Sequence, residues 1–351
     1  IYVYDDANYL MEIHAPYGTI KYTRDAAGNI TQQEIEGGGG IVYRDSRSYD
    51  ELNRLLNITS ATRSQSFSYD NDDNLASSTD GRNNKTAMTW DDLQRLSSVT
   101  DAKNGVSKYS YENAQSIENP SSIADAKSNS TSYKYNGLGA LLSLVSPDSG
   151  SHRAAYDANG NLLEQADARG NLITYTYDAI NRPTTITYNA DPGLNTTFNY
   201  DAPDNKGYLR FVENSYTKNY YSHNDVGNLT SLEQYIKEYY VYLNLYYSYD
   251  KANNLTQIKY SGTGSSNVVN YTYTNGQLDG VSLNGKSIAK ITHLPFGPIN
   301  KIVYSNGVTE DLSYNTDYSL KQQSLSNGLL DHEYSYYPNG QMVIPPKKEP
   351  I

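Results

Sequence analysis

The sequence predicts an all-β fold, a repeat array of antiparallel β-hairpins that forms a curled or spiralling sheet. Three observations predict it. A motif recurs about every 22 residues, the segments between copies alternate Tyr with Thr or Ser, and Asp, Asn and Gly gather in short clusters. Alternation with period two is typical of strands, and such clusters are typical of turns. No segment has a convincing helical period.

The first strand of each period is the Tyr-rich segment. In residues 173–177, the alternation places Tyr175 and Tyr177 on one face of a strand and Thr174 and Thr176 on the other. A lone hairpin is marginal in water, so the hairpins must pair laterally with their neighbours. Tyrosines at equivalent positions of paired strands would then lie near one another.

Two turns and a second strand complete the period. Residues 157–161 form the first turn, because Asp, Asn and Gly tolerate positive φ and bond their own backbone. A second strand such as 254–260 and a second turn such as 167–170 or 101–105 follow. Leu255 and Ile258 are three residues apart, so either both sheet faces are partly covered or this strand carries a bulge.

One motif fixes the period along the whole chain. Its clearest copy reads Tyr156-Asp157-Ala158-Asn159-Gly160-Asn161-Leu162. We call the residue before the Asp position the pivot. The pivots are residues 4, 24, 49, 69, 90, 111, 135, 156, 177, 200, 223, 249, 273, 293, 314 and 336, which are 20 to 26 residues apart. This spacing predicts one repeat domain over residues 1–341 with sixteen repeats, followed by an irregular tail over 342–351.

We predict that the anchor residues of this motif have a structural role. Arg24 and His293 are the least typical pivots, and Trp90 and His223 also replace the repeat Tyr. The predicted anchors are Tyr4, Asp5, Tyr49, Asp50, Tyr69, Asp70, Trp90, Asp91, Tyr135, Tyr156, Asp157, Gly160, Tyr177, Asp178, Tyr200, Asp201, Tyr249, Asp250, Tyr273 and Tyr336.

The composition nearly places the chain among disordered proteins. Leu, Ile, Val and Phe are 67 of 351 residues, and the net charge is −11. This combination of a low aliphatic and Phe content with a high net charge falls just inside the range that is typical of intrinsically disordered chains. Disordered chains are poor in aromatic residues, however, and this chain has 37 Tyr beside 37 Asn. We therefore expect a folded chain whose apolar contacts come mainly from tyrosine.

Composition also excludes several classes of protein. No run approaches the ~18–20 apolar residues of a membrane span, and the absence of cysteine excludes disulfides and thiolate metal sites. The pI of about 4.9 argues against a nucleic-acid partner. The chain begins at Ile1 without Met or a signal pattern and ends in a Pro- and Lys-rich stretch, so we expect a fragment of a longer polypeptide.

The repeat resembles a known family. The Tyr-Asp-x-x-Gly-Asn-Leu copy at 156–162 and the Tyr-Asp-x-x-Asn-Arg copies at 49–54 and 177–182 are similar to the YD repeats of Rhs proteins, of the B and C components of insecticidal Tc toxins, and of teneurins. The resemblance covers essentially the whole chain. It implies a hairpin strip that winds into part of a large hollow shell.

The resemblance implies two kinds of role. In bacterial Rhs and Tc proteins the shell encloses a C-terminal toxic domain until delivery, whereas in teneurins it belongs to an extracellular adhesion receptor. After Tyr336 we find neither the Asp- and Gly-rich segment tied to aspartyl self-cleavage nor a following effector. The resemblance therefore implies a partial shell wall whose terminal strands are open edges.

A search for catalytic or metal-binding patterns finds few candidates. Asp70, Asp72 and Asp73 place three carboxylates in four positions and are the best calcium candidate, but the Gly and distal Glu of an EF-hand loop are missing. The alternative is a structural turn. Residues 37–40 lack the Lys-Ser/Thr of a phosphate loop and are interpreted as a turn. The isolated histidines, which lack zinc-site spacing, are His14, His152, His223, His293 and His332.

The sequence therefore predicts a non-catalytic protein without a cofactor. The leading hypothesis is a structural wall of an RHS-type shell that encapsulates and helps deliver a C-terminal polymorphic toxin. The expected partners are the remainder of its own parent chain and a secretion or delivery apparatus, and the expected location is secreted or at the cell surface, in a bacterial toxin system. The alternative is a teneurin-like extracellular module for adhesion or for glycan or protein recognition.

Overall fold

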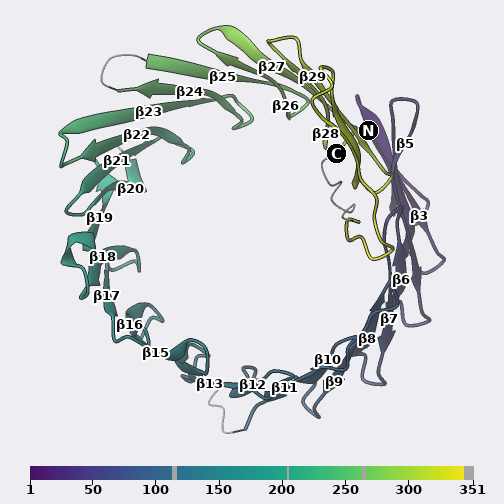
Figure 1. Ribbon diagram of the computed structural model, residues 1–351, viewed down its shortest axis with the longest axis horizontal. Coiled ribbons are helices and arrows are strands. Elements are labelled where there is room, and N and C mark those ends of the chain that lie inside the picture. Colours follow the sequence, from purple (N-terminus) through teal and green to yellow (C-terminus); the bar gives the residue numbers. More distant parts are fainter. Residues whose placement is uncertain (113–116, 204, 263–265, 344–351) are drawn as a thin grey trace, which may run out of the picture. The chain divides into compact units, whose positions relative to one another are not determined.

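The described part of the chain is made of β-structure throughout. Figure 1 shows the computed structural model, which describes residues 1–112, 117–203, 205–262 and 266–343. These residues form 31 β-strands and one short 3-10 helix, η1 (Pro192–Leu194). The all-β prediction is confirmed.

The strands belong to two compact units. Unit 1 comprises residues 1–106, 273–280 and 287–351, and unit 2 comprises residues 107–272 and 281–286. Most of the predicted irregular tail, residues 344–351, lies outside the described residues, as do residues 113–116, which follow the pivot Tyr111.

The strands of unit 1 come from both parts of the sequence. They are β1 (Tyr2–Tyr4), β2 (Leu10–Ala15), β3 (Gly18–Arg24), β4 (Ile30–Gly37), β5 (Gly40–Tyr49), β6 (Leu55–Thr59), β7 (Ser64–Tyr69), β8 (Leu75–Asp80), β9 (Lys85–Trp90), β10 (Leu96–Thr100), β28 (Ile299–Tyr304), β29 (Thr309–Tyr314), β30 (Leu320–Leu325) and β31 (Asp331–Glu333). The division between the units runs through β11 (Val106–Ser110), β25 (Ser266–Thr274), β26 (Gln277–Leu283) and β27 (Lys286–His293).

The strands of unit 2 are continuous in sequence. They are β12 (Ser122–Ala124), β13 (Ser130–Tyr135), β14 (Leu141–Ser146), β15 (Gly150–Tyr156), β16 (Leu162–Ala166), β17 (Leu172–Tyr177), β18 (Pro183–Tyr188), β19 (Thr196–Ala202), β20 (Asn205–Glu213), β21 (Thr217–His223), β22 (Leu229–Ile236), β23 (Val241–Tyr249) and β24 (Leu255–Ser261).

Consecutive strands pair with one another in antiparallel register. In unit 1 the ladder runs from β1 to β10 and again from β27 to β31. In unit 2 it runs from β11 to β25. Each period of the sequence therefore adds one hairpin to a sheet, as the repeat predicts.

A bulge follows the pivot turn in most hairpins and explains the spacing of Leu255 and Ile258. In the β23–β24 pair, Tyr249 lies opposite Leu255, whereas Ser248 lies opposite Gln257, so the second strand contains one extra residue. The same shift occurs beside Tyr49, Tyr69, Tyr156, Tyr177 and Tyr314. Of the two alternatives, the bulge is the one that the structure contains.

Very little of the sheet is covered by other parts of the chain. The buried apolar side chains among the described residues are Ile35, Ala166, Ala289 and Ile291. The accessible surface is 22131 Å², whereas a compact protein of 39.2 kDa would expose roughly 14,000 Å². Each hairpin array is therefore a single layer, and its stability rests on cross-strand contacts rather than on a closed core.

Within unit 1, the last hairpin turns lie against segments of the first hairpins, and we call this contact the seam (Figure 1). The Arg44 amide donates to the Thr316 carbonyl at 2.6 Å, and the Ser64 amide donates to the Pro338 carbonyl at 2.9 Å. The Arg82 guanidinium lies 4.3 Å from the centroid of the Tyr337 ring. On one side the seam consists of the turns 294–298, 315–319 and 337–341, and on the other of residues 17–18, 37, 43–44, 60–64 and 80–82.

Glycine makes the closest approach at the seam possible. A Cβ atom on Gly81 would lie 1.9 Å from the Pro338 main-chain oxygen, so any other residue would push the 337–341 turn away. Gly137 occupies the same second place of its own turn, after Asn136, and a Cβ there would have no neighbour within 4 Å.

We expect Gly81→Ala to open this part of the seam, because overpacking of this kind costs ~1–3 kcal/mol. Hydrogen–deuterium exchange followed by mass spectrometry should show faster exchange at residues 335–343 and unchanged exchange in β12–β14. Gly137→Ala is the matched control and should leave both regions unchanged. Equal effects of the two substitutions would contradict the assigned contact.

Candidate functional site

The turn after most pivots is closed by the side chain of its first residue. In the clearest copy, the Asp157 amide donates to the Asn161 carbonyl at 2.9 Å, and the Gly160 amide donates to the Asp157 carbonyl at 3.2 Å. One Asp157 carboxylate oxygen accepts the amides of Asn159 and Asn161, and the other accepts the Asn161 side-chain amide at 2.9 Å. The bond from the Asn161 side chain, with those from the backbone, lowers the pKa of Asp157.

The same closure recurs around the carboxylates and amides of equivalent residues, on both edges of the sheet. They are Asp5, Asp25, Asp50, Asp70, Asp91, Asn136, Asp178, Asn224 and Asp250 after pivots, and Asp80, Asp101, Asp125 and Asp167 at the opposite edge.

The fourth residue of each such turn has a left-handed backbone. Its φ is 64° at Asn8, 63° at Asn53, 64° at Asn181, 65° at Asn253 and 86° at Gly160. Asn and Gly tolerate this conformation better than other residues do. The Asn and Gly of the motif are therefore required by the backbone of the turn.

In many repeats the pivot side chain forms a hydrogen bond to the repeat before it. The Tyr177 hydroxyl donates to the Leu162 main-chain carbonyl at 2.9 Å, and the Tyr249 hydroxyl donates to the Leu229 carbonyl at 2.9 Å. Each acceptor follows the turn of the preceding repeat. The same bond is made by Tyr49, Tyr69, Tyr314 and Tyr336, by the Trp90 indole N–H and by the Arg24 guanidinium.

The predicted anchors Tyr200, Asp201 and Tyr273 lie beside turns of another kind. Asp201 itself has a φ of 61° and accepts the Gly207 amide, while the Arg182 guanidinium donates to it from the preceding repeat. After Tyr273, Asn275 and Gly276 both have positive φ and form a two-residue hairpin turn.

The remaining predicted pivots lie on their strands with different surroundings. Tyr4 is 54% exposed on β1. The Tyr135 ring stacks at 6.3 Å from Tyr133. The Arg182 guanidinium lies over the Tyr200 ring, with its Cζ atom 4.3 Å from the ring centroid. Tyr156 lines a hollow of unit 2.

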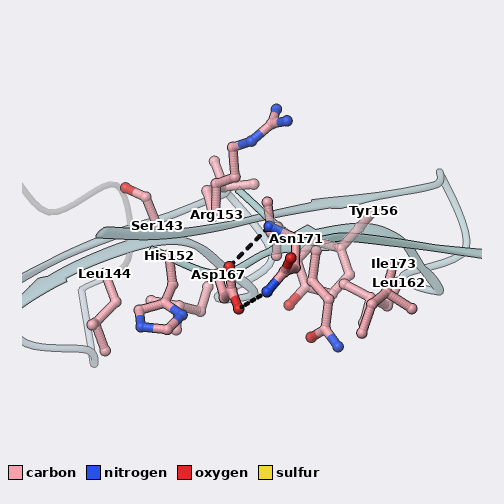
Figure 2. Close-up of a pocket in the computed structure, with 14 residues that line it drawn as sticks. Ser143, Leu144, His152, Arg153, Tyr156, Leu162, Asp167, Asn171 and Ile173 are labelled. Carbon is pink, nitrogen blue, oxygen red and sulfur yellow. Dashed lines mark hydrogen bonds between the residues drawn. The ribbon is translucent and has the colours of Figure 1, made fainter. Parts of the chain in front are cut away.

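That hollow lies over β14–β17 and has a volume of about 340 Å³. Figure 2 shows His152, Tyr156 and Asp167 around it, with the bonds between Asp167 and Asn171 dashed. His152 Nε2 lies 3.0 Å from the Ser149 carbonyl oxygen. The His152 ring and the Asp167 carboxylate are thus hydrogen-bonded within the strands and turns of the sheet.

The calcium candidate, Asp70, Asp72 and Asp73, forms part of a hydrogen-bonded turn. The carboxylate of Asp70 accepts amides of its own turn, and Asp73 pairs with the Arg54 guanidinium at 2.5 Å. The Asp72 amide is one of the donors to Asp70. Within the described ranges, no group of three or more His, Asp or Glu could hold a metal ion.

Two histidines occupy pivot positions. The His223 ring stacks on Tyr208 at 4.9 Å. Burial lowers the pKa of both His223 and His293, which favours the neutral ring.

Asp317 is the polar centre of the seam. Its carboxylate accepts the Thr62 amide at 2.8 Å, and hydroxyl groups of Ser60, Thr62 and Ser319 also donate to it. Burial alone would raise the pKa of Asp317, but the bonds from Ser319 and Thr62 outweigh it and lower this pKa to about 2. Nearby, the Tyr43 and Tyr318 ring centroids are 5.2 Å apart.

The sequence predicts the repeat anchors but not the acceptor of the pivot. One signal was available. The residues that replace Tyr at the pivot are Arg24, Trp90, His223 and His293, all of which carry an N–H donor. A donor at the end of the strand is thus what these substitutions share. The sequence contains no comparable indication of the seam, since Asp is common in turns and Asp317 does not differ from other turn residues.

A family model described as Teneurin YD-shell matches residues 4–228, more than half of the chain. A search among curated protein sequences finds no match. In the described residues, no helix is long and apolar enough to span a membrane.

Solved structures share the fold. The Tc holotoxin pore of Photorhabdus luminescens matches 97% of this chain with 13% identity and a TM-score of 0.56, over 22% of its own chain. The TcdB2–TccC3 crystal structure matches 93% with 14% identity and a TM-score of 0.53, over 23% of its own chain. This chain therefore spans less than a quarter of the length of these two solved chains.

We expect Tyr177→Phe to lower the free energy of unfolding by ~1–3 kcal/mol, because the Leu162 carbonyl loses its donor while the ring remains. Urea unfolding followed by circular dichroism should show a lower midpoint. Tyr239→Phe is the control, since Tyr239 is 67% exposed, and should leave the midpoint unchanged. A midpoint for Tyr177→Phe equal to that of the unsubstituted chain would contradict the role of the pivot bond.

The seam should withstand moderate acid. The pKa of Asp317 is lowered to about 2 in the folded chain, against about 3.9 for an unperturbed Asp. Its contribution is therefore complete above pH ~4 and is lost as the pH falls towards 2. Hydrogen exchange of residues 315–319, corrected for the intrinsic effect of pH, should stay slow from pH 7 to 4.5 and accelerate below pH 3. Loss of protection already at pH 5 would show that another group controls the seam.

Proposed function

Because the chain belongs to the teneurin YD-shell family, we propose that it is a non-catalytic wall of an RHS-type shell that encloses a C-terminal toxic domain of a longer parent protein and helps to deliver it. The single observation that carries this proposal is the way in which the repeats are joined. Backbone ladders link neighbouring strands, and pivot side chains such as Tyr177 bond to the repeat before.

A wall built in this way suits enclosure. A sheet that is one layer thick exposes both faces to solvent or cargo, so its side chains must be amphipathic, which favours tyrosine. The turn carboxylates are used to close turns, as at Asp157 and Asp178, which supports a structural rather than a catalytic role for the acidic residues.

The proposed partners follow from the length of the related chains. This chain covers only 22% of the Tc holotoxin chain that it matches, so we infer that the rest of its parent polypeptide completes the shell. A secretion or delivery apparatus would then act on the whole assembly, in a secreted or cell-surface toxin system of a bacterium.

A teneurin-like recognition module is the second candidate, and one observation favours it. Four tyrosines are exposed on or beside β23: Tyr239 by 67%, Tyr240 by 80%, Tyr242 by 48% and Tyr246 by 45%. Exposed Tyr side chains are frequent in binding surfaces for proteins.

Protease protection tests the enclosure. The natural reading frame that contains this chain is expressed whole and treated with proteinase K. We expect the sequence that follows the shell to resist digestion, and to become sensitive when pivot bonds are removed together by Tyr69→Phe, Tyr177→Phe and Tyr249→Phe. Tyr239→Phe and Tyr240→Phe serve as the matched control and should leave protection intact.

Two results would contradict the enclosure. One is a reading frame with no domain after the repeats. The other is a downstream domain that is digested as fast in the unsubstituted protein as in the triple variant. Binding of the intact protein to cells, lost with Tyr242→Ala and Tyr246→Ala, would then favour the recognition module.

A further inference from the structure

Two turn positions of neighbouring repeats face each other along the pivot edge of the sheet. We call the left-handed residue of a turn its corner residue, and the residue after it, directly before the next strand, its exit residue. Between Asp25 and Ile30, for example, Gly28 is the corner and Asn29 the exit. The exit side chain of one repeat reaches the corner of the next.

Polar exit residues meet polar corner residues. The Asn29 side-chain amide donates to the Asn53 side-chain oxygen at 2.7 Å. Asn161 donates to Asn181 at 2.8 Å, and Asn228 donates to Asn253 at 3.0 Å. The exit residue Arg54 donates to the corner carboxylate of Asp73. Amide thus faces amide, and guanidinium faces carboxylate.

Aromatic exit residues meet glycine. A Cβ atom on the corner residue Gly28 would lie 2.7 Å from the Tyr9 ring, and one on Gly227 would lie 2.8 Å from the Tyr208 hydroxyl. Tyr9 and Tyr208 are the residues directly before Leu10 and Leu209, which pair with the pivots Tyr4 and Tyr200.

A small exit residue leaves its corner open. The exit residue Ala140 precedes the repeat whose corner is Gly160, and a Cβ atom on Gly160 would have no neighbour within 4 Å. The junction from Asn74 to Gln94 is an exception: the Asn74 side-chain amide bonds to its own Asp70, and among the described residues it makes no hydrogen bond to Gln94.

We propose that the exit and corner residues form a recognition site by which each hairpin selects the hairpin that follows it. The matching chemistry is an aromatic ring with glycine, an amide with an amide, and a guanidinium with a carboxylate. Both positions lie in turns, outside the backbone ladder, which is the same for every pair of strands and cannot distinguish one neighbour from another. This proposal does not depend on what the shell encloses.

A double-mutant cycle at Tyr9 and Gly28 tests the proposal, with hydrogen exchange of residues 5–10 and 25–30 as the measurement. Gly28→Asn keeps a residue that tolerates positive φ but drives its Cβ into the Tyr9 ring. Exchange should accelerate about tenfold, or ~1.4 kcal/mol. Adding Tyr9→Asn recreates the amide pair seen at Asn29 and Asn53 and should restore exchange to within about threefold of the unsubstituted chain. Tyr9→Asn alone completes the cycle.

Gly160→Asn is the matched control, because its φ of 86° is close to the 89° of Gly28 but its corner is open. Its exchange should change by less than about twofold. The proposal is overturned if Gly160→Asn is as damaging as Gly28→Asn, or if the Tyr9→Asn and Gly28→Asn pair is no better than Gly28→Asn alone.

A second junction keeps the test decisive if Gly28→Asn fails to fold. Asn53→Gly retains the left-handed corner but removes the oxygen that accepts from Asn29, so exchange at residues 25–30 should accelerate at least threefold. Asn8→Gly is its control, since Asn8 has a φ of 64° and its side chain accepts no bond from the described residues. Equal effects of these two substitutions would also overturn the proposal.

Discussion

The hydrogen bond that many pivot side chains make to the preceding repeat is the interaction on which the rest of the structure depends. The β6–β7 ladder ends at the pair of Asn57 and Ser66, so the Leu55 carbonyl lies beyond it. The Tyr69 hydroxyl supplies the missing donor. Because an unpaired main-chain carbonyl costs ~1–3 kcal/mol when shielded from water, this bond stabilises the junction between the two repeats.

Tyrosine suits this position because it combines two properties that most residues offer separately. Its ring covers part of a sheet that has no second layer, and its hydroxyl reaches a carbonyl of the neighbouring repeat. Trp90 and Arg24 replace the pivot Tyr but keep the hydrogen-bond donor, although their side chains differ in shape from Tyr. The Asp-closed turn complements it by holding the strand ends in place without a core.

Sequence reasoning reached the fold because every local signal agreed with the period. Alternation, turn residues and repeat spacing all specified hairpins, and even the bulge at Leu255 was visible as one of two alternatives. The junctions were less accessible, because the acceptor of Tyr177 is a main-chain atom that no residue type reveals. The seam could not be found at all, since the contact of Asp317 with Thr62 joins residues 255 positions apart whose types are common in turns.

The scarcity of buried side chains has a consequence for how such proteins diverge. In most proteins a large core ties many positions together, and substitutions must be compensated by their neighbours. Here the buried apolar side chains among the described residues are Ile35, Ala166, Ala289 and Ile291. Few positions are therefore constrained by packing against neighbours. Mutations can accumulate on both faces while turns and pivots persist, and the fold is kept although only 14% of residues match the TcdB2–TccC3 structure.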